Sequence, residues 1–187
     1  MWWSDLRPIG SRLARLAPVL AAAGLLAGCF QPLYGERSLT GGPGIKTALS
    51  SIDIAQIPAA NGTPESRVAV DLRNQLMFNL NGNVPTPPTH RLDVKISTTR
   101  LSVIVDLTSA RPEVENYGIV ASYNLVELKT GRVVVNDQTF SRVSFDSPGQ
   151  QQRFARVRAL REAEGRATQL IADNIRNRLA SYFVAGT

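Results

Sequence analysis

The first 28 residues of the chain differ in kind from the rest, and this division decides which part of the sequence takes part in a fold. Arg7, Arg12 and Arg15 make the start basic, and the apolar stretch Leu16 to Leu26 follows. A basic start followed by an apolar core of this length is typical of a signal peptide for export. We therefore predict that residues 1–28 are a signal peptide and that the chain is exported.

The single cysteine of the chain, Cys29, directly follows this segment. The run Leu26, Ala27, Gly28 and Cys29 has the form of a bacterial lipobox, with small residues before the cut and a thiol that takes a diacylglycerol. We expect Leu26, Ala27 and Gly28 to be recognised by signal peptidase, and Cys29 to carry an S-diacylglycerol and an N-acyl chain such as palmitate. Two or three acyl chains hold a protein on a membrane stably. An ordinary signal peptide with a chance cysteine is the alternative.

The residues after Cys29 indicate where the anchored chain is held. Phe30 occupies the position at which an Asp usually marks retention at the inner membrane, so we expect the inner leaflet of the outer membrane, on the periplasmic side. Residues 36–50 are rich in Gly, Ser and Thr, which is typical of a flexible tether. The segment 29–50 is thus predicted to be an acylated N-terminus and tether.

The remaining residues, 51–187, are predicted to form one domain. Their number suits a single hydrophobic core, and the 43% hydrophobic and 19% charged residues of the chain are typical of a globular protein. One cysteine cannot form an internal disulfide. No segment after the signal peptide approaches the roughly 20 apolar residues of a membrane-spanning helix, so a multi-pass membrane protein is excluded.

Apolar periodicity in this domain predicts strands and helices in the order β-α-β-β-β-α. The strands are expected over 51–57, 92–107, 117–128 and 133–145, and the helices over 64–80 and from after Pro148 to about 183. Such an order is typical of an α+β fold in which two helices pack on one face of a mostly antiparallel four-stranded sheet.

Local signals support these elements. Thr63 precedes Pro64 as a helix N-cap, and Gly131 suits a tight hairpin turn that needs positive φ. The apolar positions of the strand 92–107 change from even to odd numbers, which predicts a bulge or break near Thr98 and Thr99.

The start of the mature chain resembles a known family. The run Cys29-Phe30-Gln31-Pro32-Leu33-Tyr34-Gly35 is similar to the opening of the LPS-assembly lipoproteins called LptE, several of which begin Cys-Gly-Phe-x-Pro-Leu-Tyr-Gly. This chain lacks the Gly after the cysteine. Phe145-Asp146-Ser147-Pro148 is similar to a Phe-Asp-Asn-Pro stretch of that family, and the predicted order of elements is the one that the resemblance implies.

The resemblance implies an accessory lipoprotein of the outer membrane rather than an enzyme. Its expected role is that of plug and assembly partner inside the LPS translocon barrel, LptD, where it assists LPS transport and insertion. LPS itself is an expected direct ligand.

The sequence contains no pattern that predicts catalysis, a metal site or a cofactor. A hydrolase needs a nucleophile beside a base, and the single histidine, His90, lies at a strand entry where a surface or capping role is expected. Clusters of His, Cys or carboxylates that bind metals are lacking. Glu113 and Glu115 are expected to be solvated in a loop, and Glu162 to form a weak surface pair with Arg166.

The chain has a net charge of +6 and a basic excess that suits an anionic ligand. Export excludes nucleic acid, whereas arginine forks suit the phosphates of LPS. In a meander, the loop before Tyr117 and the end of the strand near Phe145 lie at the same edge of the sheet, so Arg111 and Arg142 are expected to approach one another. They are the candidate LPS-binding residues, and ordinary surface arginines are the alternative.

Two other functional classes stay open. One is an auxiliary lipoprotein of a periplasmic lipid-transport ABC system, which would bind phospholipid and a different protein complex. The other is a structural lipoprotein or hydrolase of the cell wall, although the hydrolase lacks a nucleophile and base pair.

Overall fold

A computed structural model gives the fold and describes residues 44–81, 86–106, 111–147 and 152–185. The chain divides into two units, Met1–Gly35 and Glu36–Thr187, and all described residues belong to the second unit. The predicted signal peptide, lipobox and acylated cysteine lie outside the described residues.

Four strands form one sheet in the order β1-β2-β3-β4. Strand β1 (Ile52–Ile54) pairs with β2 (His90–Asp106) in parallel, while β3 (Arg111–Glu127) and β4 (Val133–Asp146) continue as an antiparallel meander.

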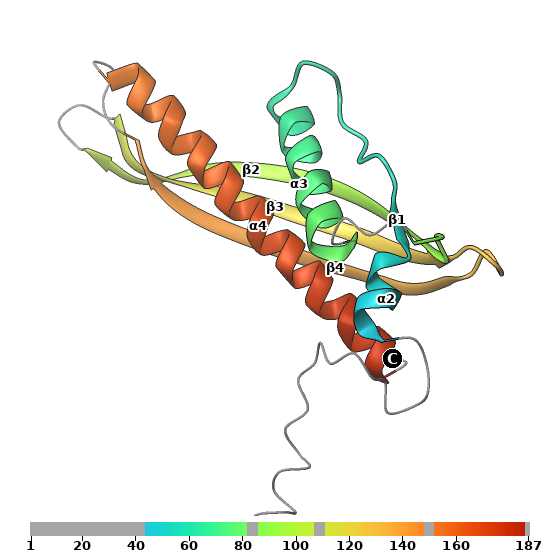
Figure 1. The fold of residues 1–187 in the computed structure, drawn as a ribbon. Helices are drawn as coiled ribbons and strands as arrows, with labels where there is room; N and C mark the ends of the chain where they lie inside the picture. Colours follow the sequence, from blue (N-terminus) through green and yellow to red (C-terminus); the bar gives the residue numbers. More distant parts are fainter. Residues whose placement is uncertain (1–43, 82–85, 107–110, 148–151, 186–187) are drawn as a thin grey trace, which may run out of the picture. The chain divides into compact units, whose positions relative to one another are not determined.

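The sheet is covered by helices on one side (Figure 1). Helix α3 (Pro64–Asn81) packs against β1 and β2, and helix α4 (Arg153–Ala185) packs against β3 and β4. This arrangement confirms the predicted α+β fold with two helices on one face of a mostly antiparallel sheet.

The core lies between these helices and the alternate residues of the strands that face them. Each strand contributes its inward-facing positions, and the helices contribute apolar stripes with helical spacing. The most deeply buried large side chains are Ile52, Val68, Leu72, Leu76, Leu92, Ile119, Leu125, Ile171, Ile175 and Leu179. The predicted stripe of α3, spaced every four residues, is therefore confirmed.

The local signals for the ends of elements also hold. The backbone N–H of Ser66 donates to the Oγ1 of Thr63 at 3.3 Å, which is the hydrogen bond of a helix N-cap. Gly131 has φ +70° in the β3–β4 turn, a conformation that residues with a side chain rarely adopt.

The flexible tether was predicted to extend to Ser50, and this boundary is wrong. Residues Ile45–Ser50 form the short helix α2, which packs against α3 and α4. The side chains of Ala48 and Leu49 are buried there. Burial of these two apolar side chains stabilises the helix, although the segment 36–50 is rich in Gly and Ser.

The predicted break near Thr98 and Thr99 is also wrong. Strand β2 pairs with β3 without interruption through both residues, and its register shifts only between Ser102 and Val105. Leu101 is 57% exposed because it lies on the face of the sheet away from the helices. The change of apolar parity therefore reflects apolar residues on the uncovered face rather than a change in the backbone.

The core of α3 predicts a clear contrast between two neighbouring residues. Replacing the fully buried Leu76 with Ala should lower the free energy of unfolding by about 3 kcal/mol, because it leaves a cavity in the core. Phe78→Ala on the exposed side of the same helix should change it by about 0.5 kcal/mol or less. Denaturant unfolding of both variants checks this, and equal losses would contradict the assigned faces.

Candidate functional site

The face of the sheet away from the helices, here called the open face, is formed by side chains of β2, β3 and β4. Pairing of the strands places its residues in rows across the three strands. One row is Asp93, Asn124 and Asn136, and the next row is Lys95, Ser122 and Gln138.

A shallow groove of about 510 Å³ lies along these two rows. Asn136 Nδ2 donates to Asn124 Oδ1 at 2.6 Å, and Arg91 pairs with Asp93 at 3.2 Å beside the groove. Phe140 lies on the same face, two residues beyond Gln138 on β4, and is 72% exposed. The open face therefore combines a neutral polar groove with an exposed aromatic ring.

A buried carboxylate cluster lies at the other end of the sheet, on the covered face. Glu115 on β3 is 2% exposed and forms ion pairs with Arg100 on β2 and Arg156 on α4. Ser147 Oγ donates to Glu115 Oε1 at 2.6 Å, and the guanidinium of Arg100 also lies 5.7 Å from the ring centre of Phe145. The predicted solvated position of Glu115 is therefore wrong.

The hydrogen bond from Arg100 lowers the pKa of the Glu115 carboxyl to about 2, against the opposite effect of burial. Ser147 and the positive charge of Arg156 act in the same direction as Arg100. The carboxylate is thus charged at neutral pH and holds the start of α4 to the sheet.

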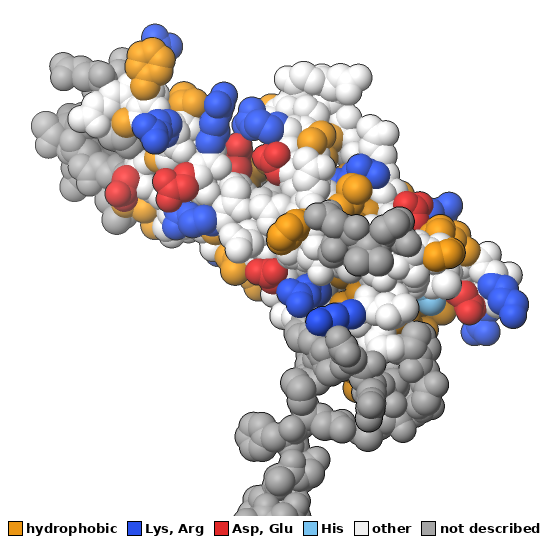
Figure 2. All heavy atoms as spheres, viewed as in Figure 1, with side chains coloured by type: hydrophobic (Ala, Val, Ile, Leu, Met, Phe, Trp, Pro, Cys, Tyr) orange, Lys and Arg blue, Asp and Glu red, His pale blue; other side chains and the backbone are white. Residues whose placement is uncertain are grey.

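The first turns of α4 present a cationic and apolar surface. None of the residues from Arg153 to Glu162 is buried, and Phe154 is 90% exposed. Arg153, Val157 and Arg161 follow at i, i+4 and i+8, so they lie on one side of the helix. Figure 2 shows basic side chains gathered around this part of α4, with hydrophobic side chains between them. Such a surface suits an anionic amphiphile.

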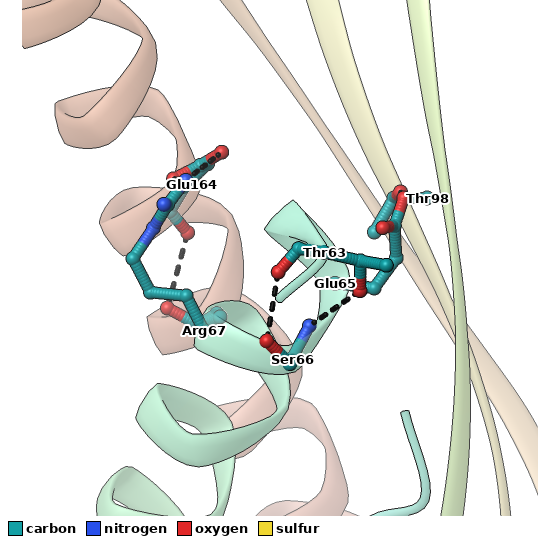
Figure 3. Close-up of polar contacts among 7 residues, drawn as sticks. Thr63, Glu65, Ser66, Arg67, Thr98 and Glu164 are labelled. Carbon is teal, nitrogen blue, oxygen red and sulfur yellow. Dashed lines mark hydrogen bonds and ion pairs between the residues drawn. The ribbon is translucent and has the colours of Figure 1, made fainter. Parts of the chain in front are cut away.

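Helices α3 and α4 are joined by a second buried carboxylate (Figure 3). Glu164 on α4 is 4% exposed and accepts hydrogen bonds from the Nη2 of Arg67 at 2.9 and 3.1 Å. At the start of α3, Thr98 on β2 donates to Glu65 at 2.8 Å. These contacts fix the two helices to each other and to the sheet.

The structure does not bring the two candidate LPS-binding arginines together. Arg111 is the first residue of β3 and pairs with Asp106, while Arg142 on β4 pairs with Gly118. Seven residues of strand separate Arg111 from Gly118, or about 23 Å at about 3.3 Å per residue. The expectation that they approach one another fails because β2 and β3 continue beyond β4. Arg142 is exposed on the open face, and the side chain of Arg111 lies outside the described residues.

His90 lies at the start of β2 as predicted. Its Nδ1 lies 2.8 Å from Thr89 Oγ1, and its ring packs edge-on against Phe183 of α4 at 5.3 Å. Burial lowers the pKa of His90. Within the described residues, no group of three or more His, Cys, Asp and Glu side chains is placed to hold a metal ion. The predicted Glu162–Arg166 pair is present at 3.8 Å.

None of the helices in the described part of the chain combines the length and apolar character needed to cross a membrane. The lipidation residue Cys29 and the recognition residues Leu26, Ala27 and Gly28 lie outside that part, so their roles stay predictions.

Comparison with known proteins identifies similar folds. A candidate lipoprotein of Caulobacter crescentus CB15 aligns with a TM-score of 0.58 and 24% identity, over 76% of this chain and 97% of that protein. Rare lipoprotein B of Shewanella oneidensis aligns with a TM-score of 0.50 and 13% identity, over 71% and 96% of the two chains. An uncharacterised lipoprotein B of Nitrosomonas europaea aligns with a TM-score of 0.52 and 10% identity, over 73% and 90%.

These likenesses show that the chain has the fold of solved lipoprotein structures. No family model matches the sequence, and a search of curated proteins gives no significant match.

The Glu115 cluster predicts a dependence of stability on pH. Because the carboxyl pKa falls from 4.5 to about 2 in the folded chain, its contribution is fully present above about pH 4.5 and is lost as the pH falls towards 2. Glu115→Gln should lower the free energy of unfolding by about 2 kcal/mol at pH 7, because it removes the charge that strengthens these hydrogen bonds, and it should flatten the decline of stability in acid. Denaturant unfolding between pH 2 and 7 measures both effects.

Glu162→Gln is the matched control, because it removes one carboxylate from an exposed pair on α4, the helix that Glu115 holds to the sheet. It should cost at most about 0.5 kcal/mol. An equal loss of unfolding free energy in Glu115→Gln and Glu162→Gln would contradict the role of Glu115 in holding α4 to the sheet.

Proposed function

We propose that the chain is an outer-membrane lipoprotein that acts as plug and assembly partner of the LPS translocon barrel LptD. In this role it assists the transport of LPS and its insertion into the outer membrane, while its acylated Cys29 holds it in the inner leaflet on the periplasmic side.

The observation that carries the proposal is the position of Cys29, the single cysteine, at the end of a lipobox and ahead of a fold that solved lipoprotein structures share. The mature start from Cys29 to Gly35, which resembles that of the LptE lipoproteins, adds a second and independent argument.

The geometry of the domain suits this role. The described residues begin just before α2, and the residue after this helix, Ser51, accepts a hydrogen bond from the backbone N–H of His90. The ring of His90 contacts Phe183 near the end of α4. Helix α4 has 33 residues, or about 50 Å at 1.5 Å per residue. Its cationic first turns therefore lie tens of ångströms from α2. A domain anchored on its α2 side would reach into a barrel lumen with this basic end, where anionic LPS passes.

Partner capture tests the proposal directly. The acylated protein is isolated from detergent-solubilised outer membrane through a C-terminal tag, and the bound proteins are identified by mass spectrometry. We expect a stoichiometric LPS translocon barrel. Recovery of inner-membrane ABC transporter components would instead support the auxiliary-lipoprotein alternative, and recovery of neither would remove both.

Acylation gives a separate test of the anchor. Cys29→Ser should abolish incorporation of labelled palmitate and leave the uncut precursor, because the hydroxyl of serine does not take the diacylglycerol. Membrane fractionation and gel mobility measure the result. Ser38→Ala, which lies after the cut, is the control and should be acylated normally. Continued labelling of the Cys29→Ser variant would overturn the lipobox assignment.

LPS binding is tested with the two candidate arginines. Since the strands place Arg111 and Arg142 far apart, each would contact LPS separately, and the losses from Arg111→Ala and Arg142→Ala should add in the double variant. We expect each to weaken binding about fivefold, the effect of one charge-assisted hydrogen bond. The double variant Lys129→Ala/Arg132→Ala removes the same charge from the β3–β4 turn and should bind as the parent does. If both double variants lose the same LPS affinity, the loss reflects net charge alone and contradicts the assignment of Arg111 and Arg142 as the binding residues.

A further inference from the structure

The groove on the open face is built from residues that strands rarely favour. Asn is depleted in strands, where β-branched and aromatic residues are more stable. Asn124 and Asn136 nevertheless lie side by side on β3 and β4, with Gln138 and Ser122 in the next row. The hydrogen bond between the two amides stabilises this exposed pair only slightly, so stability alone gives little reason for the choice and the pattern points to a ligand.

Hydrogen-bond donors and acceptors both line this groove. Each amide side chain offers two donors and an acceptor, and a serine hydroxyl offers both. The bond from Asn136 Nδ2 to Asn124 Oδ1 uses one donor and one acceptor, which leaves the carbonyl of Asn136 and the NH₂ group of Asn124 to meet a ligand. A ligand with an amide group can pair with such side chains through a donor and an acceptor at once.

The groove has no cluster of like charges. Asp93 and Lys95 line its β2 side with opposite charges, Arg91 pairs with Asp93 beside it, and the other outward-facing lining residues are neutral. The groove therefore differs from the arginine-rich start of α4, where like charges gather.

An aromatic ring extends the groove at one end. Phe140 follows Gln138 on the same face of β4 and pairs across the sheet with Val120. Its exposed ring is accessible to a ligand that lies in the groove. The C–H face of a pyranose ring is a suitable cover, because it is flat and weakly polar while its rim carries hydroxyl groups.

We propose that this groove binds a neutral, N-acetylated oligosaccharide, such as the glycan of a bacterial cell wall. One sugar ring stacks on Phe140, and the acetamido and hydroxyl groups of the next rings bond to Asn124, Asn136 and Gln138. This inference does not depend on the barrel partnership, since it concerns another ligand on another face of the domain.

The test uses the full acylated chain in detergent micelles and chitotetraose as the probe. The side-chain NH₂ signals of Asn124, Asn136 and Gln138 should shift in ¹⁵N-correlated NMR spectra as chitotetraose is added. Maltotetraose, which lacks acetamido groups, should bind at least about tenfold more weakly, the effect of losing one or two hydrogen bonds. This mapping on the unaltered protein does not rely on the folding of a variant.

Variants then locate the site. Asn136→Ala and Phe140→Ala should each weaken chitotetraose binding about tenfold. Asn116→Ala is the matched control, because Asn116 lies on the same open face and accepts a bond from Ser144 at 2.7 Å, but does not line the groove. It should bind as the parent does.

Three results would overturn the proposal. They are an absence of shifts in the groove amides at millimolar chitotetraose, an equal affinity for maltotetraose, and an equal loss in Asn116→Ala. None of them bears on capture of the translocon barrel, so the two proposals fail separately.

Discussion

The close packing of α4 across the sheet is the constraint on which the rest of the structure depends. Small residues make this contact possible, and they include the fully buried Ala163, Ala167, Ala172 and Ala180. Ser141 Oγ on β4 donates to the backbone carbonyl of Ala167 at 3.1 Å, which shows how near the helix lies to the strand. With α4 fixed over β3 and β4, α3 fills the remaining half of the same face over β1 and β2.

This one-sided packing divides the domain into surfaces with different chemistry. The covered face holds the apolar core and the buried carboxylates Glu115 and Glu164, which tie the helices in place. The open face carries the neutral groove and Phe140. The unburied first turns of α4 carry arginines and Phe154. One fold thus presents several surfaces that differ in charge and polarity.

Much of the fold could be predicted because its elements depend on local periodicity. The spacing of Val68, Leu72, Leu76 and Leu80 suffices to define the covered side of α3, and Gly131 marks the β3–β4 turn. The length of β3 was not predicted. Its first third, residues 111–116, contains Pro112, which disfavours a strand. Register depends on partners distant in sequence, so neither the separation of Arg111 from Arg142 nor the rows of the groove could be derived.

Glu115 is a different case, because a signal was present. It has the same odd parity as Tyr117, Ile119 and Ala121, so it belongs to the inward side of β3. A charged residue at an inward position needs a charged partner, and the arginines at 100 and 156 supply it. Leu101 shows the reverse, since an apolar residue on an outward position suggested a change in the strand that does not occur. Sequence patterns thus indicate faces well only where polarity and burial agree.

The unequal lengths of the strands also set the order in which the fold opens. Strand β4 ends its pairing at Asp146 opposite Val114, whereas β2 and β3 continue to the pair Asp106 and Arg111. A ribbon of two strands has little stability of its own. Amide hydrogens of this ribbon will therefore exchange with solvent by local opening, whereas those of β3 opposite α4 exchange only when the core unfolds.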